Sequence, residues 1–279
     1  SKGLLDPKVD FVFKNIFGSP NHPEILISFL NATLKAKKKI VNVDIKKTDI
    51  EKQYIEDKYS RLDVKATTSN DEIINIEIQL KNENNMVKRS LYYLSKMYEE
   101  QLNEKEDYSK LVRTVCINIL NFKYLKTDNF HTGYRFKEIE SNEELTDIME
   151  VHFIEIPKLQ DSSDEKDMLV AWTEFLKDPE SEKVRGLELS IEEIRQAKDE
   201  LIRMSNDSTQ RELYDMRANS LRDKMSELNA AERKGIEKGR EEGRKEEKIK
   251  IARNMKLSGL DTNTIAKITN LSEDEIDKL

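Results

Sequence analysis

Three residues within one short stretch of the chain have the types and the spacing to bind a metal ion. The segment SRLDVKATTSNDEIINIEIQL, residues 60–80, carries Asp63, Glu77 and Gln79 among alternating polar and apolar residues. This alternation on both sides of the polar centre TSND predicts two strands joined by a tight loop. With the loop centred on Asn70, residues equally distant from it lie opposite each other, and Asp63 faces Glu77. The polar face of the hairpin is therefore a candidate site.

Two carboxylates placed opposite each other on neighbouring strands destabilise the sheet unless another interaction compensates. Their Cβ atoms lie about 4.5–5.5 Å apart, and the like charges repel. A divalent cation bound through oxygens at about 2.0–2.6 Å would bridge Asp63 and Glu77 and offset that repulsion. A four-residue loop would instead bring Asp63 nearest Ile76 and mix the two faces, so the first register is favoured. The alternative is a half-exposed hairpin whose polar face meets water, and the pattern alone leaves both interpretations open.

The composition excludes several other kinds of site. The 279-residue chain has one cysteine, Cys116, and three histidines, His22, His131 and His152. The histidines do not have the spacing of a zinc site, and the sequence contains no Gly-rich phosphate loop. A bound metal would then be held mainly by oxygen ligands, which suits Mg, Mn or Ca. Cys116 stands in the apolar run LVRTVCINIL, so we expect a buried core residue and not a catalytic thiol.

The chain reads as that of a cytoplasmic protein. No apolar run approaches the roughly 20 residues of a membrane helix. The start SKGLLDPKVDFVF has no apolar h-region, and a single cysteine suits a reducing compartment. The net charge of −7 argues mildly against strong nonspecific nucleic-acid binding, although local clusters matter more than totals.

The surrounding sequence predicts the elements that position the hairpin. Apolar residues at helical spacing indicate helices, and short apolar or alternating runs indicate strands. Their order predicts an α/β fold, a mixed sheet flanked by helices, in which the strand at 111–122 is apolar enough to be covered on both faces. The predicted helices are residues 6–17, 22–35 and 84–102, and the other predicted strands are residues 40–45, 133–139 and 149–159.

After about Leu159 the composition becomes helical. Residues 161–229 form a predicted helical extension, with Trp172 in its core. Residues 230–257 form a charged connector in which glycines recur every four residues. Glycine costs a helix about 1 kcal/mol relative to alanine, and the Glu–Lys spacing partly compensates. We expect a long solvated helix or a semi-flexible segment here.

The last segment, residues 258–279, predicts two short helices in a helix-turn-helix arrangement. Such an element normally needs a third helix to build a core, and its second helix, EDEID, is acidic. An interaction or capping role is therefore favoured over DNA readout. We also expect that the C-terminal helices can pair in a homodimer. The predicted buried contacts are Ile265, Ile268, Leu271 and Ile276, and the predicted caps are Asp261, Ser272 and Glu275.

Several of these segments, taken in order, resemble one known family. They are LLDPKVDFVFKNIFG, SRLDV, IEIQL, KRSLYYLSKMYEEQL, VCINIL and KGIEKGREEGRKEEK. The set resembles the PD-(D/E)XK nuclease superfamily, and more closely the Rpn-type recombination-promoting nucleases, also described as PD-(D/E)XK family putative transposases. The resemblance implies a PD-(D/E)XK core over residues 1–160. It further implies a metal-dependent DNA endonuclease, using Mg²⁺ or Mn²⁺, that acts in recombination or on mobile DNA.

The resemblance also implies roles for individual residues. Asp63 and Glu77 would be metal ligands, and the backbone carbonyl of Ile78 would add a third. Gln79 stands where many superfamily members have lysine, and a neutral amide can orient water only by hydrogen bonding. Asp10 would supply a further acid. The implied reaction is phosphodiester hydrolysis without a covalent intermediate, and strand transfer is the weaker inference.

Phosphate contacts are implied for a second group of residues. An arginine could hold the scissile phosphate bidentately, and a tyrosine could hydrogen-bond it. Two of these residues have structural alternatives: Lys14 and Asp10 could form a surface i,i+4 ion pair, and Tyr93 could belong to the core. The alternative function is a catalytically weak or inactive DNA- or protein-binding module that keeps the nuclease fold. The implied phosphate-binding residues are Lys14, Arg89, Tyr93 and Lys96.

Overall fold

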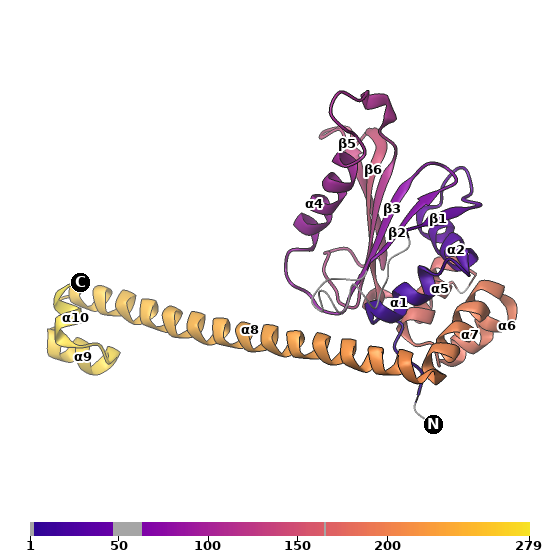
Figure 1. Ribbon diagram of the computed structural model, residues 1–279. Coiled ribbons are helices and arrows are strands. Elements are labelled where there is room, and N and C mark those ends of the chain that lie inside the picture. The colour runs from indigo at the N-terminus through magenta and orange to yellow at the C-terminus, as the bar shows by residue number, and fades with distance from the viewer. Residues whose placement is uncertain (1–2, 47–62, 165) are drawn as a thin grey trace. The chain divides into compact units, whose positions relative to one another are not determined.

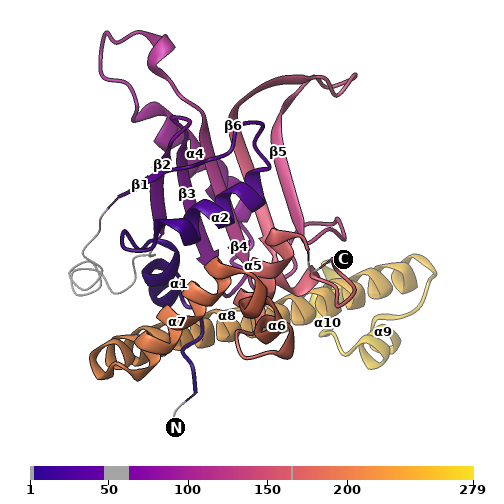
Figure 2. The same cartoon turned by 90° about the vertical axis from the view of Figure 1, so that its right-hand side faces the viewer.

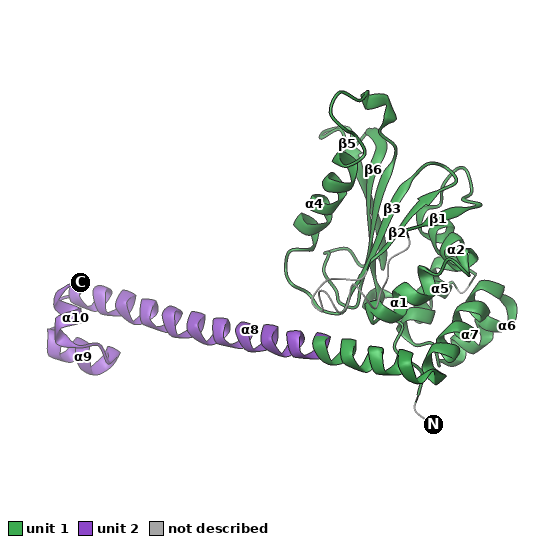
Figure 3. Ribbon diagram, in the orientation of Figure 1, with its two compact units in different colours: residues 1–220 green, residues 221–279 purple. Residues whose placement is uncertain are grey.

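The computed structural model of the chain describes residues 3–46, 63–164 and 166–279. It divides into two compact units, residues 1–220 and residues 221–279 (Figure 3). Residues 60–62 of the predicted first hairpin strand lie outside the described residues. No helix in the described ranges combines the length and the apolar character of a membrane span.

A mixed six-stranded sheet forms the centre of the first unit (Figure 1). The strand order is β1-β2-β3-β4-β6-β5. The β3–β4 and β4–β6 pairs are parallel, whereas β1–β2, β2–β3 and β5–β6 are antiparallel. The predicted α/β class with a mixed sheet is confirmed. The strands are β1 (Val43–Ile45), β2 (Val64–Thr68), β3 (Ile73–Gln79), β4 (Thr114–Leu120), β5 (His131–Lys137) and β6 (Glu144–Glu155).

Helices cover both faces of this sheet. In Figure 1, α4 lies on one side and α1, α2 and α5 lie on the other, with α6 and α7 packed outside them. Figure 2 shows this second group in front of the sheet. The helices are α1 (Asp10–Phe17), α2 (Pro23–Leu34), α4 (Met86–Glu99), α5 (Met168–Lys177), α6 (Glu182–Ser190) and α7 (Glu192–Asn206), with short 3-10 turns at Tyr108–Lys110 and Ile156–Lys158.

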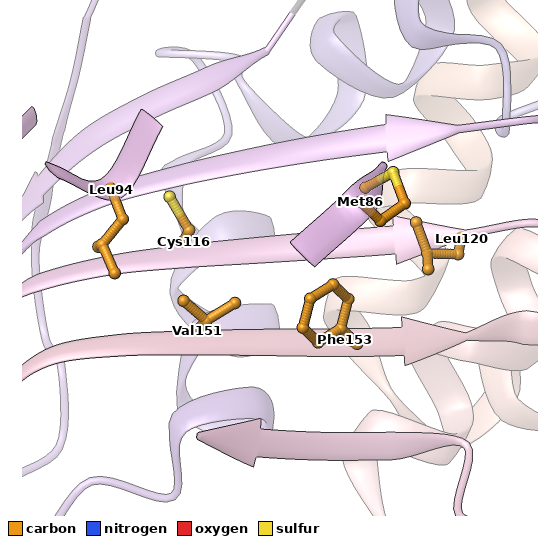
Figure 4. Close-up of a cluster of buried hydrophobic side chains, with 6 residues drawn as sticks. All are labelled: Met86, Leu94, Cys116, Leu120, Val151 and Phe153. Carbon is orange, nitrogen blue, oxygen red and sulfur yellow. The ribbon is translucent and has the colours of Figure 1, made fainter. Parts of the chain in front are cut away.

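Under α4 the sheet is mainly apolar at β4 and β6, apart from Asn118 of β4, which accepts a hydrogen bond from Ser90 of α4 at 3.1 Å. Met86 and Leu94 of α4 pack there on Cys116 and Leu120 of β4 and on neighbouring side chains of β6 (Figure 4). Every residue of β4 is buried, as expected for a strand covered on both faces. Cys116 is a core residue, and burial raises the pKa of its thiol to about 12, with the Glu77 and Asp63 carboxylates adding to that rise. A thiol in this state is not a nucleophile at neutral pH.

The opposite face is closed by aromatic side chains from helices that are distant in sequence. Phe13 and Phe17 of α1 stack with ring centroids 4.5 Å apart. Phe17 also meets Phe29 of α2 and Trp172 of α5 edge-on, at 5.5 and 5.2 Å. Trp172 is fully buried, which confirms its predicted place in the core. These contacts fix α1 against α2 and α5, and α1 carries two of the candidate site residues.

One continuous helix, α8 (Ser208–Leu257), leads into the second unit. It contains the glycine-spaced segment, whose charged side chains are exposed. The following helices, α9 (Thr262–Thr269) and α10 (Glu273–Asp277), carry the expected N-cap at Asp261 and the expected Ser272–Glu275 capping box.

The end of α8 supplies the third helix that the tail needs for a core. Ala252 of α8 is buried together with Ile265, Leu271 and Ile276. The prediction for Ile268 was wrong, because this side chain is 57% exposed. In α9 the buried stripe runs through Ile265 and Thr269, which are four residues apart, and Ile268 falls beside it.

Candidate functional site

The hairpin has the register that the sequence pattern favoured. Val64 pairs with Ile76, Lys65 with Asn75 and Ala66 with Ile74. Glu72 and Thr68 close the loop through a backbone hydrogen bond of 2.9 Å. The next residues beyond the Val64–Ile76 pair are Asp63, directly before β2, and Glu77 within β3. Both carboxylates act electrostatically on the Cys116 thiol, so they lie at the same part of the sheet.

Glu77 is positioned from β3 toward α4. Its side chain is 10% exposed, and its Oε2 lies 3.5 Å from Nε of Arg89. This is a long contact, close to the limit for a hydrogen bond. The Arg89 guanidinium also lies over the Tyr93 ring, 4.8 Å from its centroid. Arg89 is thus held between an acid and a ring, and its role as a phosphate contact stays a prediction.

Gln79 follows Glu77 on the same face of β3, because alternate strand residues share a face. The residue is buried, and within the described residues its Nε2 has no hydrogen-bond partner. An unpaired buried amide costs about 1–3 kcal/mol, so its retention calls for an explanation. The backbone carbonyl of Gln79 accepts from Asn121 on the β4 side. Since successive carbonyls of a strand alternate in direction, that of Ile78 points toward the β2 side, where Asp63 lies.

Two lysines stand beside Asp63. The Lys65 ammonium is 3.6 Å from the Asp63 carboxylate and half exposed. Lys14 of α1 is 7% exposed, and burial lowers its pKa, while the Asp63 carboxylate acts in the opposite direction. With Arg89, three cations therefore surround two carboxylates. Such a balance leaves positive charge for a phosphate group.

Asp10 takes part in a buried ion pair. Its Oδ1 accepts from Nε of Arg217 at 2.8 Å and from the Phe11 amide at 2.9 Å, and its Oδ2 accepts from Nη2 of Arg217. Asp10 and Lys14 are both buried, so the alternative of a surface ion pair between them was wrong. Arg217 was not predicted, since it lies about two hundred residues away in sequence, outside the predicted core.

The remaining predicted residues lie around this group in different ways. Tyr93 is half-buried beneath Arg89. Lys96 is exposed, two turns from Arg89 along α4, and its ammonium lies 3.7 Å from Glu100. Within the described residues, no cluster of three or more His, Cys, Asp or Glu side chains is arranged to hold a metal. Asp63, Glu77 and the carbonyl of Ile78 therefore stay the predicted metal ligands.

Comparison with known protein families identifies the family of the chain. Residues 7–231 match the family model described as the PD-(D/E)XK nuclease family transposase. The chain belongs to this family. Residues 245–279 match the C-terminal HTH domain of the Rpn/YhgA-like nuclease family, and this match includes the end of α8 together with α9 and α10. The resemblance to Rpn-type PD-(D/E)XK nucleases is thereby confirmed. No curated protein matched the chain. No solved structure matched it.

The family match covers more than the predicted core. It runs through α5, α6 and α7 into α8, so the helices after residue 160 belong to the nuclease-family region. The matched HTH segment also begins within α8. The helix-turn-helix arrangement of the tail agrees with this family description, and DNA is the partner class that both matches favour. The interaction or capping role that the acidic second helix favoured over DNA readout is not supported by this description and stays a prediction.

Proposed function

We propose that this member of the family is a metal-dependent DNA endonuclease that hydrolyses phosphodiester bonds of recombining or mobile DNA. The observation that carries the proposal is the polar face of β2 and β3. It brings Asp63, Glu77 and the unpaired amide of Gln79 together within a sheet that is otherwise closely packed. Family membership supports a nuclease, and this face is where its chemistry can take place.

The donor set fits a hard divalent cation. Carboxylate and carbonyl oxygens are the ligands that Mg²⁺ prefers, and Mg²⁺ usually keeps water and substrate phosphate in its other positions. Asp63, Glu77 and the carbonyl of Ile78 would hold it. When bound, such an ion lowers the pKa of a water molecule and stabilises charge on the phosphoryl and leaving oxygens.

The protein side chains have separate tasks in this proposal. Arg89 and Lys14 bind the scissile phosphate, and the Tyr93 ring supports the Arg89 guanidinium. The amide of Gln79 donates a hydrogen bond that orients the attacking water, in place of the charge that a lysine would add. Lys96 lies farther along α4 and would contact a flanking phosphate. Asp10 is held by Arg217 and serves the site through its helix.

Cleavage of supercoiled plasmid tests the proposal. Wild-type protein is compared with Asp63→Asn and Glu77→Gln in Mg²⁺ or Mn²⁺, with EDTA as the metal-free condition. We expect each substitution to lower the cleavage rate by about 10³-fold, equivalent to roughly 4 kcal/mol of transition-state stabilisation. Asp44→Asn is the matched control, because Asp44 is an exposed carboxylate on β1 of the same sheet.

The outcomes separate the two candidate functions. Loss of cleavage in both variants and in EDTA, with Asp44→Asn active, supports the hairpin as the metal site. Cleavage that survives both substitutions contradicts the site. If no form cleaves but the protein binds DNA in a mobility-shift assay, the chain is a binding module that keeps the nuclease fold.

A further inference from the structure

The first turns of α8 hold the N-terminal segment at three points. Nη2 of Arg211 donates to the carbonyl of Gly3 at 2.7 Å, and the hydroxyl of Tyr214 accepts from the amide of Asp6 at 3.4 Å. Arg217 then binds Asp10 through both carboxylate oxygens. The α8 residues follow one another at intervals of three, so they lie along one side of the helix. All these contacts lie within the first unit.

The third contact differs from the other two in burial and charge. Arg217 is 3% exposed and Asp10 is 6% exposed. A two-point arginine–carboxylate pair fixes the relative orientation of its partners more firmly than a single hydrogen bond. By comparison, the hydrogen bonds of the Arg211 guanidinium within the described part of the chain go to backbone carbonyls, those of Gly3 and Ser205. The helix therefore makes its most specific contact at the first residue of α1.

From Asp10 the geometry leads to the candidate site. Lys14 lies one turn further along α1, on the same side of the helix. Its ammonium is buried near Asp63, and within the described residues it makes no hydrogen bond or ion pair. With no such contact to hold the ammonium, its location depends on how α1 is seated on the sheet. The backbone of α1 is closely packed there, since a side chain at Gly18 would meet Val64 of β2 at 3.3 Å.

We propose that Arg217 is a positioning residue for the nuclease site: by binding Asp10 it seats α1 so that the Lys14 ammonium stands beside Asp63. The role of Lys14 as a phosphate contact rests on the proposed function. The role of Arg217 in holding α1 in place does not. The helical extension then contributes to the site, and the chain up to residue 160 is insufficient for full activity.

The test combines a kinetic readout with a positional one. Arg217→Met removes the guanidinium while keeping the length of the side chain, and Arg217→Lys keeps the charge without the two-point geometry. Arg211→Met is the matched control on the same helix. For each full-length variant, kcat and KM for plasmid cleavage are measured well below the unfolding midpoint. Separately, an amine-reactive reagent labels the native protein, and mass spectrometry quantifies labelling at Lys14.

Lys198 serves as the internal reference for global opening. It is 9% exposed, and its ammonium binds the Pro179 carbonyl and lies 3.6 Å from the Glu188 carboxylate. For Arg217→Met we expect at least fivefold faster labelling of Lys14, unchanged labelling of Lys198, and at least a tenfold lower kcat with KM within threefold. Arg217→Lys should recover part of both effects. Arg211→Met should leave both within twofold even where it lowers the unfolding temperature.

Each result decides a separate question. Unchanged Lys14 labelling in folded Arg217→Met, or an equal rise in Arg211→Met, overturns the positioning role. Faster labelling with unchanged kcat overturns its link to catalysis. If Arg217→Met does not fold, Arg217→Lys carries the same comparison with a smaller expected rise. If wild-type protein does not cleave, the proposed function fails, and the labelling still decides whether Arg217 seats α1.

Discussion

Two groups of buried charged residues share the central sheet, and they differ in how completely they are paired. At β4–β6, Glu150 is 2% exposed and accepts hydrogen bonds from Arg113 at 2.9 Å, from Arg135 and from His152. Arg113 also binds Glu72, and Arg135 binds Glu144. In this group, the Glu150 carboxylate is surrounded by hydrogen-bond donors. We call the group the Glu150 network; its members are Glu72, Arg113, Arg135, Glu144, Glu150 and His152.

The polar group at β2–β3 is less completely paired by hydrogen bonds and ion pairs. Gln79 has an amide nitrogen without a partner, and Glu77 has its arginine only at 3.5 Å. Buried polar groups in stable folds are almost always paired, so a deficit marks a place where something else is expected to bind. The comparison teaches that burial of charge alone does not indicate function. Here the structural group is the saturated one, and the candidate site is the one with free capacity.

The largest expected difference between the two groups is in stability. Glu150→Gln removes the charge that Arg113 and Arg135 share, and breaking a buried pair in this way costs about 3–5 kcal/mol of unfolding free energy. Glu77→Gln should change it by less than about 1 kcal/mol, because the Arg89 contact is long and a like charge opposite Asp63 is removed. Urea unfolding at neutral pH, without divalent metal, measures both.

Cleavage should show the reverse order in the same two proteins. Folded Glu150→Gln, measured below its unfolding midpoint, should keep its rate within about threefold, whereas Glu77→Gln should be nearly inactive. If urea unfolding shows equal losses of stability in the two variants, the difference in pairing between the two groups does not affect the free energy of unfolding.

The sequence could predict the hairpin and its register because a period of two is a strong local signal. One shift by a residue would have turned Ile74 and Ile76 away from the core, so the alternation selects a single pairing. The same local logic predicted the caps at Asp261 and Ser272. It also predicted that β4 is buried on both faces, because none of its seven residues is charged.

Contacts between distant residues were beyond such reasoning. Asp10 and Arg217 are in contact because α8 packs next to α1. The sequences of the two helices contain no pattern that predicts this contact. His131 and His152 lacked metal-type spacing, yet their rings stack across β5 and β6, with Nε2 and Nδ1 2.9 Å apart. The exposure of Ile268 depended on which side of α9 meets α8, and the apolar pattern allowed either side.

The Glu150 network should also make stability depend on pH. Burial and the neighbouring His152 lower the pKa of His131 from 6.5 to about 4. Burial raises the pKa of Glu150, but the His152 and Arg135 hydrogen bonds outweigh it and bring the pKa to about 2. Both folded-state values lie below the unfolded ones. The unfolded chain therefore binds protons first, and stability falls as the pH drops.

Two pH windows follow from these values. His131 removes stability between pH 6.5 and about 4, by about 3 kcal/mol, and Glu150 adds a further loss between pH 4.5 and about 2. In His131→Gln, the urea midpoint should no longer depend on pH above pH 4.5. In His22→Gln, the pH dependence of the midpoint should be that of wild type, because His22 is a half-exposed histidine outside the network. An equally steep loss in His131→Gln would remove His131 as the origin of the upper window.

The smallest expected effect concerns the deficit at Gln79 itself. Gln79→Lys would place an ammonium between two carboxylates, Asp63 and Glu77, and supply the missing ion pairs in the absence of metal. We expect the metal-free unfolding temperature to rise by about 2–4 °C, which corresponds to roughly 1 kcal/mol in a domain of this size. The added charge also repels a divalent cation, so the further rise on adding Mg²⁺ or Mn²⁺ should be smaller than in wild type.

A second glutamine provides the control for this substitution. Gln196 lies on α7 beside Glu192, away from the sheet, so Gln196→Lys adds the same charge outside the site. It should leave the metal-induced shift as in wild type. If Gln79→Lys lowers the metal-free unfolding temperature and keeps the full metal shift, the two carboxylates do not share a cation site with residue 79. The incomplete group would then be a packing defect of the hairpin, and the contrast with the Glu150 network would lose its functional meaning.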